Sequence, residues 1–224
     1  MRRWIATLAL ACVAACAAGG ARDALSPPPV PGVAILIIEP DVQLSLLTVN
    51  ARKIPRADWS AAARMLVAQH VRDAVQSKGR TAVLQARADV SVQGRQILLL
   101  HDAVLTSIRI SEDDDPPPTL SRRRTWTLGV GARALGEETG ATHALIVSAD
   151  GEVTSAARAA FVVGAAAMGV LAHTGLQRAS ASLVDLETGD IVWRNAVVAA
   201  PDQDMRDPDG AHRLVTALLN GAPL

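Results

Sequence analysis

The sequence predicts a single α/β sandwich over residues 33–224, with a mixed, partly antiparallel sheet and about four to five helices. Apolar runs of strand length alternate along the chain with segments that have the apolar period of a helix. The clearest strand pair is a hairpin, in which residues 179–186 and 191–198 flank the turn Glu187-Thr188-Gly189-Asp190. Because a hairpin pairs its strands antiparallel, a mixed sheet is favoured over a doubly wound parallel one.

The first strand is expected at residues 33–38, a continuous apolar run rich in β-branched residues and typical of a strand buried on both faces. Glu39-Pro40-Asp41 is predicted to end it, and residues 42–49 to form a second, shorter strand. Residues 81–92 fit a further short strand and a turn.

The first helix is expected to begin near residue 55, where Asp58 or Ser60 can cap it, and to end at Gly79. His70 lies on its apolar side and is interpreted as a hydrogen-bonded histidine at the edge of the core. The predicted apolar stripe comprises Trp59, Ala63, Leu66, His70, Val71 and Ala74.

A second helix and a charged loop are expected next. The helix is predicted from the spacing of Ile97, Leu100, Val104 and Ile108, widened by Leu98 and Leu105. The loop at 112–124 places an acidic run, three prolines and three arginines in succession. Such a segment is usually solvated, and the alternative is a loop that docks a partner.

The C-terminal third supplies the remaining elements. A third helix is expected at 126–139, capped by Thr125 and ended by Gly140, followed by a strand at 143–148 and a turn at Asp150-Gly151. In the hairpin, the side chains expected on a core face are Leu183, Ile191 and Trp193. The last helix begins at Asp207-Pro208-Asp209-Gly210, and its apolar residues are Leu214, Val215, Leu218 and Leu219.

Two local patterns resemble ligand sites, and for both a structural role is favoured. Gly129 to Ala134 match the letters G-x-G-x-x-A of a dinucleotide fingerprint, but no strand precedes them, so close packing explains the glycines better and no cofactor is predicted. The weak candidates for a calcium site are Asp202, Asp204, Asp207 and Asp209. EF-hand spacing is absent there, so a turn and helix cap are favoured and no metal is predicted.

Composition and motifs exclude several classes of function. Lys plus Arg and Asp plus Glu both number 22, and the aromatic residues are four Trp and one Phe, so neither a basic field nor stacking platforms for nucleic acid are present. None of the common hydrolase, zinc-site, redox or phosphate-loop motifs occurs. We therefore predict no catalytic residues and no enzyme.

The N-terminus has the layout of a secretory signal: Arg2 and Arg3 precede an apolar run over residues 4–13. This run is too short to span a bilayer. It ends in Val13-Ala14-Ala15-Cys16, which resembles a bacterial lipobox, in which the cysteine is lipidated and the chain is cut before it. The alternative is an ordinary cleaved signal that uses Ala9-Leu10-Ala11.

These features divide the chain into three parts: a signal peptide at 1–15, a lipidated Cys16 with a flexible tether at 16–32, and the α/β domain at 33–224. The only other cysteine, Cys12, is lost with the signal, so no disulfide is expected. In Gram-negative lipoproteins of this kind, Ala rather than Asp after the cysteine implies export to the outer membrane, so the domain is expected to face the periplasm.

Residues 159–176 are eighteen residues without a charge, half of them Ala or Gly. As a helix they would be about 27 Å long, just short of the hydrocarbon thickness. Three interpretations stay open: a buried or peripheral soluble segment, a self-association surface with closely packed small residues, and a membrane-inserting element.

Several segments together resemble a group of proteobacterial envelope lipoproteins. They are the lipobox at Cys16, ILIIEPDVQLSLL at 35–47, Arg56-Ala57-Asp58-Trp59, and ASLVDLETGDIVW at 181–193. More remotely, the layout and the late hairpin resemble the superfamily of CsgG and the TolB N-terminal domain, an α/β sandwich whose relatives act by protein contact.

The resemblance implies a non-enzymatic lipoprotein that presents its domain to an envelope protein partner or to copies of itself. One alternative is a CsgG-like oligomeric subunit that uses residues 159–176 in a membrane assembly. The other is a periplasmic hydrolase or small-ligand binder.

Overall fold

The computed structural model describes residues 34–113, 126–169 and 174–224. Its centre is one mixed sheet in the order β2-β1-β4-β5-β6, with β3 also paired to β1. β1 runs parallel to β3 and β4, and the other pairs are antiparallel. The strands are β1 (Ala34–Leu47), β2 (Lys53–Pro55), β3 (Thr81–Gln85), β4 (His143–Thr154), β5 (Gln177–Asp185) and β6 (Ile191–Val198).

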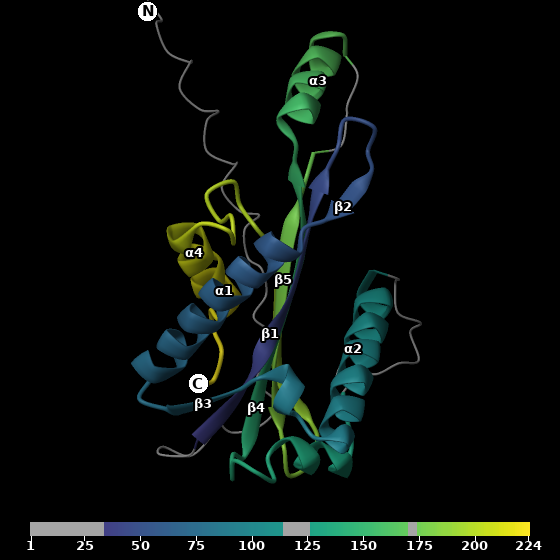
Figure 1. Ribbon diagram of the computed structural model, residues 1–224. Coiled ribbons are helices and arrows are strands. Elements are labelled where there is room, and N and C mark those ends of the chain that lie inside the picture. The colour runs from purple at the N-terminus through teal and green to yellow at the C-terminus, as the bar shows by residue number, and fades with distance from the viewer. Residues whose placement is uncertain (1–33, 114–125, 170–173) are drawn as a thin grey trace, which may run out of the picture.

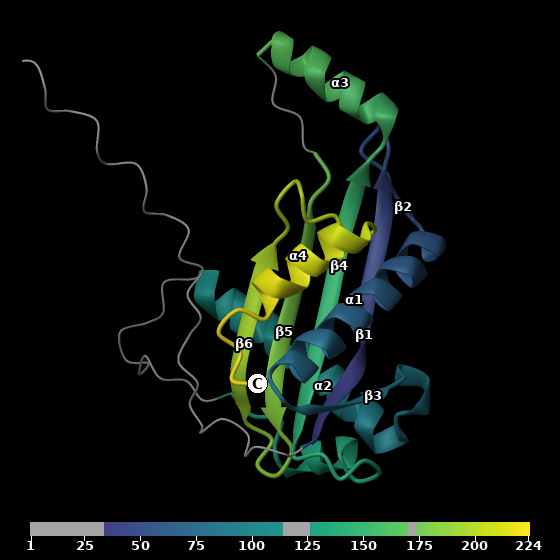
Figure 2. The ribbon, with the colours of Figure 1, turned by 90° about the vertical axis from the view of Figure 1, so that its left-hand side faces the viewer.

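Helices cover both faces of this sheet, which confirms the predicted α/β sandwich (Figures 1 and 2). α1 (Ala57–Ser77) and α4 (Pro208–Leu218) lie on one face, and α2 (Val92–Asp113) lies on the other with the 3₁₀ segment η2 (Val130–Leu135). A second 3₁₀ segment, η1 (Arg87–Asp89), connects β3 to α2. α3 (Ala156–Ala167) follows β4 directly and projects beyond the end of the sheet.

Each face of the sheet has its own hydrophobic core. Ile35 and Ile37 of β1 point towards α1 and α4, whereas Leu36 and Ile38 point towards α2. This alternation explains why the start of β1 is apolar at every position. Beyond Asp41 only the face towards α1 stays apolar, so one half of the opposite face is left polar.

β1 is a single strand of 14 residues, so the prediction that Glu39-Pro40-Asp41 ends it was wrong. The register with β4 shifts between Ile38 and Asp41, where Pro40 lies. On the other edge of β1, β3 pairs only as far as Ile38 and β2 pairs only from Ser45. Pro40 therefore lies where that edge has no strand partner among the described residues, and a missing N–H is tolerated there.

β4 likewise continues through Asp150-Gly151, where the sequence suggested a turn. Gly151 packs against the neighbouring strand: a Cβ built at this position would lie 2.7 Å from Gln177 Cγ. The glycine is thus explained by close approach of β5 rather than by chain reversal.

The helix expected at 126–139 is absent; within this range the structure contains only the short η2. Thr127 forms an isolated bridge with Asp190, and the Leu128 N–H donates to Gly189 O at 2.8 Å. Gly129 has φ +71°, which breaks a helix. The segment before η2 is therefore held by the turn of the β5–β6 hairpin rather than by its own helical bonds.

Other predicted elements are confirmed in their broad outline. Gly79 follows the end of α1 with φ +74°, the hairpin turns at Gly189 with φ +81°, and Asp207 caps α4 by accepting from the Gly210 N–H at 2.9 Å. His70 lies at the core edge, with its Nε2 3.1 Å from Pro208 O.

The predicted cap of α1 was wrong. Arg56 is the N-cap residue and makes no side-chain cap. The Ser60 hydroxyl instead accepts from the Leu44 N–H and donates to Arg56 O. Asp58 pairs with the Arg56 guanidinium.

Two apolar stripes are displaced from their predicted positions. Leu100 of α2 is 42% exposed, and the buried positions of that helix include Leu98, His101 and Ile108. In the hairpin, Leu183 and Trp193 share the core under α1, as expected, but Ile191 lies in the opposite core. A register shift after Leu183 accounts for this change of face.

Candidate functional site

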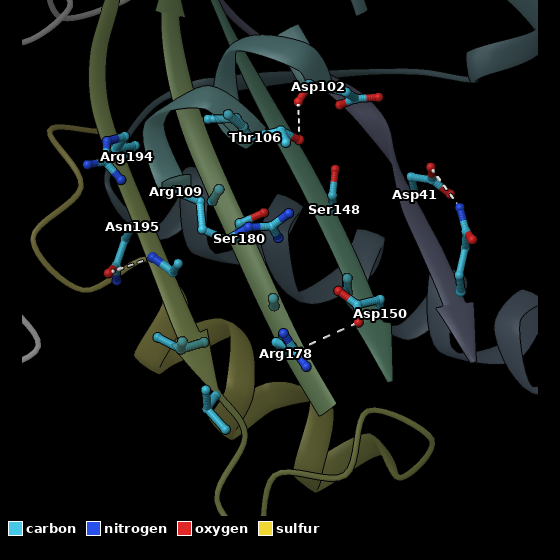
Figure 3. Close-up of a pocket in the computed structure, with 18 residues that line it drawn as sticks. Asp41, Asp102, Thr106, Arg109, Ser148, Asp150, Arg178, Ser180, Arg194 and Asn195 are labelled. Carbon is cyan, nitrogen blue, oxygen red and sulfur yellow. Dashed lines mark hydrogen bonds and ion pairs between the residues drawn. The ribbon is translucent and has the colours of Figure 1, made fainter. Parts of the chain in front are cut away.

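The polar half of the sheet face under α2 forms an open groove of about 570 Å³. α2 makes one wall, and the floor spans β1, β4, β5 and β6 (Figure 3). Its polar lining residues are Asp41, Gln43, Asp102, Thr106, Arg109, Ser148, Asp150, Arg178, Ser180, Arg194 and Asn195. We call this feature the groove.

Strand register sets the shape of the groove. Asp41 is paired with Ser148, Ser148 with Ser180, and Ser180 with Ala196, so these four residues form one row across the sheet. Three of the four have short side chains, which leaves a hollow perpendicular to the strands. The next row outward, Gln43, Asp150, Arg178 and Val198, carries longer side chains and makes the second wall.

The charges of the groove are separated along its length. Arg178 and Arg194 come from β5 and β6, whereas Asp41 and Asp150 come from β1 and β4. Arg178 Nε and Asp150 Oδ2 are 3.9 Å apart, a loose ion pair at the boundary between the two ends (Figure 3). The β5–β6 end is thus cationic and the β1–β4 end anionic. α2 adds Asp102 and Arg109 to the wall.

The sequence carried a signal for this groove that motif reasoning missed. In β4, Ser148 and Asp150 alternate with the buried Val147 and Ala149. β5 repeats the pattern with Arg178 and Ser180, which alternate with the buried Ala179 and Ala181. Polar residues at every second position of two neighbouring strands predict an uncovered half-face.

A serine, a histidine and an aspartate meet beside the groove. His101 Nε2 is 2.5 Å from Ser182 Oγ, and His101 Nδ1 is 3.3 Å from Asp102 Oδ1. This order is that of a nucleophile, a base and an orienting carboxylate. However, the side chains of Ser182 and His101 are completely buried and only Asp102 lines the groove, so no substrate can reach the hydroxyl. The arrangement is a polar link that holds α2 on β5.

The four aspartates considered for calcium are engaged in separate roles. Asp204 binds Arg206 and Gln177, Asp207 caps α4, Asp202 lies 3.3 Å from Arg213, and Asp209 is in the first turn of α4. Among the residues that the structure describes, no group of three His, Cys, Asp or Glu side chains could hold a metal.

Asp204 is the most strongly held of these carboxylates. Partial burial raises the pKa of Asp204, but hydrogen bonds from Arg206 and Gln177 outweigh this and lower the pKa to about 2. The Arg206 guanidinium also lies 4.9 Å from the centre of the Trp59 ring, and Arg56 lies 4.0 Å from it. The cluster fastens the loop before α4 to the start of α1.

Three other groups have shifted pKa values. The hydrogen bond between Arg56 and Asp58 raises the pKa of the Arg56 guanidinium and lowers the pKa of the Asp58 carboxyl. Burial lowers the pKa of His143, an effect that the Asp185 carboxylate opposes. None of these three residues lines the groove.

α3 and its C-cap expose three large apolar side chains to solvent. Phe161, Val163 and Met168 are 50%, 72% and 78% exposed. At its base the buried Arg158 donates to Thr48 O and Val49 O at 3.3 and 3.2 Å. No helix within the described ranges has both the length and the apolar content needed to cross a membrane.

Cys16, the predicted lipidation site, lies outside the described residues, as do the signal peptide, the whole tether, residues 114–124 of the charged loop and the predicted cap residue Thr125. Of residues 159–176, the structure describes all but 170–173, and it places 159–167 in α3.

No protein-family model and no curated protein matches the chain. Solved structures that resemble it include the PelC dodecamer from Paraburkholderia phytofirmans, with 11% identity, a TM-score of 0.42 and coverage of 92% of this chain and 98% of that one. A lipoprotein from Neisseria meningitidis has 12% identity, a TM-score of 0.36 and coverage of 84% and 96%. The LpoB C-terminal domain from Escherichia coli has 15% identity, a TM-score of 0.30 and coverage of 79% and 90%.

Proposed function

We propose that this chain is a non-enzymatic lipoprotein, anchored through Cys16 to the periplasmic side of an outer membrane, that presents its α/β domain to an envelope protein partner. The lipobox pattern at Val13–Cys16 supports the anchor. A multiply acylated cysteine would hold the chain firmly, since each buried CH₂ contributes roughly 0.8 kcal/mol.

The observation that carries the contact role is the exposed apolar surface of α3. Phe161 and Val163 lie on α3, which projects from the sheet, and Met168 is its C-cap residue; the described residues leave all three open to solvent. Large apolar side chains exposed together at one end of a molecule are typical of a site of protein or membrane contact. Beside the groove the Ser182 hydroxyl and the His101 ring are buried, which supports contact rather than chemistry.

The anchor is tested by metabolic labelling with an alkyne fatty acid. Wild type should take up the label, and Cys16→Ser should lose it because the acceptor thiol is gone. Cys12→Ser is the matched control and should keep the label, since that residue is removed with the signal. Labelling of Cys16→Ser, or none of the wild type, would contradict the assignment.

The contact role is tested by cross-linking in intact envelopes, followed by mass spectrometry. The triple variant Phe161→Ser, Val163→Ser, Met168→Ser should lose the cross-linked species that wild type forms. Met65→Ser with Leu99→Ser is the control, because those side chains are each 70% exposed on α1 and α2. Equal loss in both variants, or turnover in a substrate screen, would count against the proposal.

Self-association through α3 is a second candidate, favoured by the same exposed side chains. In this case the chain would be one subunit of an oligomer that forms part of a membrane assembly. Size-exclusion chromatography with light scattering should then give a multiple of the chain mass for wild type and a single chain mass for the triple α3 variant. A monomeric wild type would leave the heterologous partner as the surviving form of the proposal.

A further inference from the structure

The groove has the dimensions of a seat for one extended chain segment. Its floor crosses β1, β4, β5 and β6 along the row Asp41, Ser148, Ser180 and Ala196. At about 4.8 Å between neighbouring strands, the three spacings give a length of roughly 14 Å. An extended peptide covers about 3.3 Å per residue, so four to five residues would cross it.

The floor and one wall supply hydrogen-bonding groups for a peptide backbone. Ser148 and Ser180 point their hydroxyls into the groove, and Thr106 adds a side chain from α2 (Figure 3). Each residue of an extended segment has one N–H and one C=O that need partners when they leave water. A purely apolar floor could not accept such a segment, whereas a floor of small hydroxyl side chains can.

The separated charges define the chemistry of the segment. Arg109 of α2 and Arg178 of β5 would pair with acidic side chains, and Asp41 of β1 with basic ones, while Asp150 holds its loose ion pair with Arg178 between them. Arg109 on α2 has no ion-pair partner among the described residues and is exposed. A ligand with only one sign of charge would meet repulsion at one end.

We infer that the groove binds an extended protein segment that carries acidic side chains at the β5–β6 end and basic side chains at the β1–β4 end. This rests on the protein partner proposed above and adds where and how it binds. α3 and the groove are separate surfaces, so loss of one contact does not require loss of the other.

The probe is a blocked peptide with two Glu, a Gly-Ser-Gly spacer and two Lys, offered to the full chain purified in detergent. Fluorescence anisotropy should detect binding, and Arg109→Gln with Arg178→Gln should weaken it at least tenfold. Arg72→Gln with Arg95→Gln is the control, because these exposed arginines lie on α1 and at the start of α2, outside the groove. Ser180→Phe should also abolish binding by filling the floor, provided that far-UV circular dichroism is unchanged.

The position and direction of the bound peptide are determined by photo-cross-linking, with a photoreactive phenylalanine placed in the peptide beside either the Glu pair or the Lys pair. Beside the Glu pair it should label β5, β6 or α2, and beside the Lys pair it should label β1 or β4. Labelling of α3, equal weakening by the control arginines, or equal affinity of an all-Glu peptide would overturn the inference. The measurement does not use the anchor, so a failed labelling of Cys16 and a failed groove are distinguishable.

Discussion

At the scale of single residues, the contact between His101 and Ser182 fixes how α2 sits on the sheet. Both side chains are completely buried, and their atoms are 2.5 Å apart. A buried imidazole nitrogen without a partner would lose hydration and gain nothing in return. The pair therefore contributes specificity to the docking of α2, although it has the outward form of a catalytic pair.

Ser182→Ala should destabilise the protein by about 1–3 kcal/mol, because the His101 nitrogen would be left buried and unpaired. Urea unfolding followed by circular dichroism measures the change. Ser180→Ala, two residues earlier on the same strand, lines the groove instead and should change the stability by no more than about 0.5 kcal/mol. Equal effects at the two positions would contradict the structural role assigned to His101.

The lowered pKa of Asp204 predicts that the folded state loses stability in acid. This pKa is about 2 in the folded chain, below the ordinary value of 3.8, so the folded state favours the ionised carboxylate. This contribution is present above the ordinary pKa and is lost as the pH falls from about 4 towards 2. Free energies of unfolding measured across this range should fall more steeply for wild type than for Asp204→Asn. Parallel curves would show that Arg206 and Gln177 do not hold the carboxylate in solution.

At the scale of elements, the hairpin turn supports the segment that leads into η2. Gly189 has φ +81°, and a Cβ there would lie 2.1 Å from Gly129 O. A substitution at this position would meet both backbone strain and a fixed backbone atom. The turn therefore connects the β5–β6 hairpin to η2 through a contact that tolerates only glycine.

Gly189→Ala should cost more than about 2 kcal/mol, because the residues around Thr127 would be displaced from the turn. Gly79→Ala is the matched control: its φ is +74°, but no atom lies within 4 Å of the added Cβ. There only the strain of the left-handed conformation applies, about 1–2 kcal/mol. Thermal unfolding of both variants measures the two losses of stability. If Gly189→Ala lost no more stability than Gly79→Ala, the steric contact with Gly129 O would be excluded.

The hydrogen bonds of Arg158 are expected to limit the mobility of α3. The Arg158 guanidinium binds the carbonyls of Thr48 and Val49 in the turn after β1. In Arg158→Leu these bonds are lost, so the amides of α3 should exchange at least tenfold faster with solvent, while those of β4 and β5 stay protected. Hydrogen exchange with mass spectrometry measures both regions. Arg72→Leu on α1 is the control, and unchanged exchange in α3 would mean that other contacts hold the helix.

Regular local signals predicted the fold well, and non-local contacts account for the errors. The apolar period of α1, the hairpin turn at Gly189 and the cap at Asp207 are encoded within a few residues. Pro40 was misjudged because its tolerance depends on where β2 and β3 pair with β1. Gly151 was misinterpreted because its reason lies in a strand distant in sequence. Gly129 was misinterpreted because its reason is a φ of +71° and not close packing, since no atom lies within 4 Å of an added Cβ. The groove was not predicted, because its signal in the sequence is the alternation of Ser148 and Asp150 with buried residues and not a motif.

At the scale of the whole molecule, two cores share the strands of one sheet. Leu183 of β5 belongs to the core under α1 and α4, and Ile146 of β4 belongs to the core under α2. Because β4 and β5 supply side chains to both cores, neither layer of helices can leave without exposing strands that the other layer needs. The domain is therefore expected to unfold in one step, although its two cores do not mix.

This architecture predicts a single unfolding transition for the whole domain. Leu183→Ala and Ile146→Ala should each lower the free energy of unfolding by about 2–5 kcal/mol without dividing that transition. Trp59 and Trp193 report on the core under α1, and Trp126 packs against the core under α2. In both variants the denaturant midpoints from tryptophan fluorescence and from far-UV circular dichroism should coincide, as they do for a two-state domain. In Trp126→Phe the tryptophan fluorescence comes from Trp59 and Trp193 in the core under α1. The midpoints from fluorescence and from circular dichroism should still coincide. Two transitions in Ile146→Ala, with the α2 layer lost first, would mean that the layers are energetically independent.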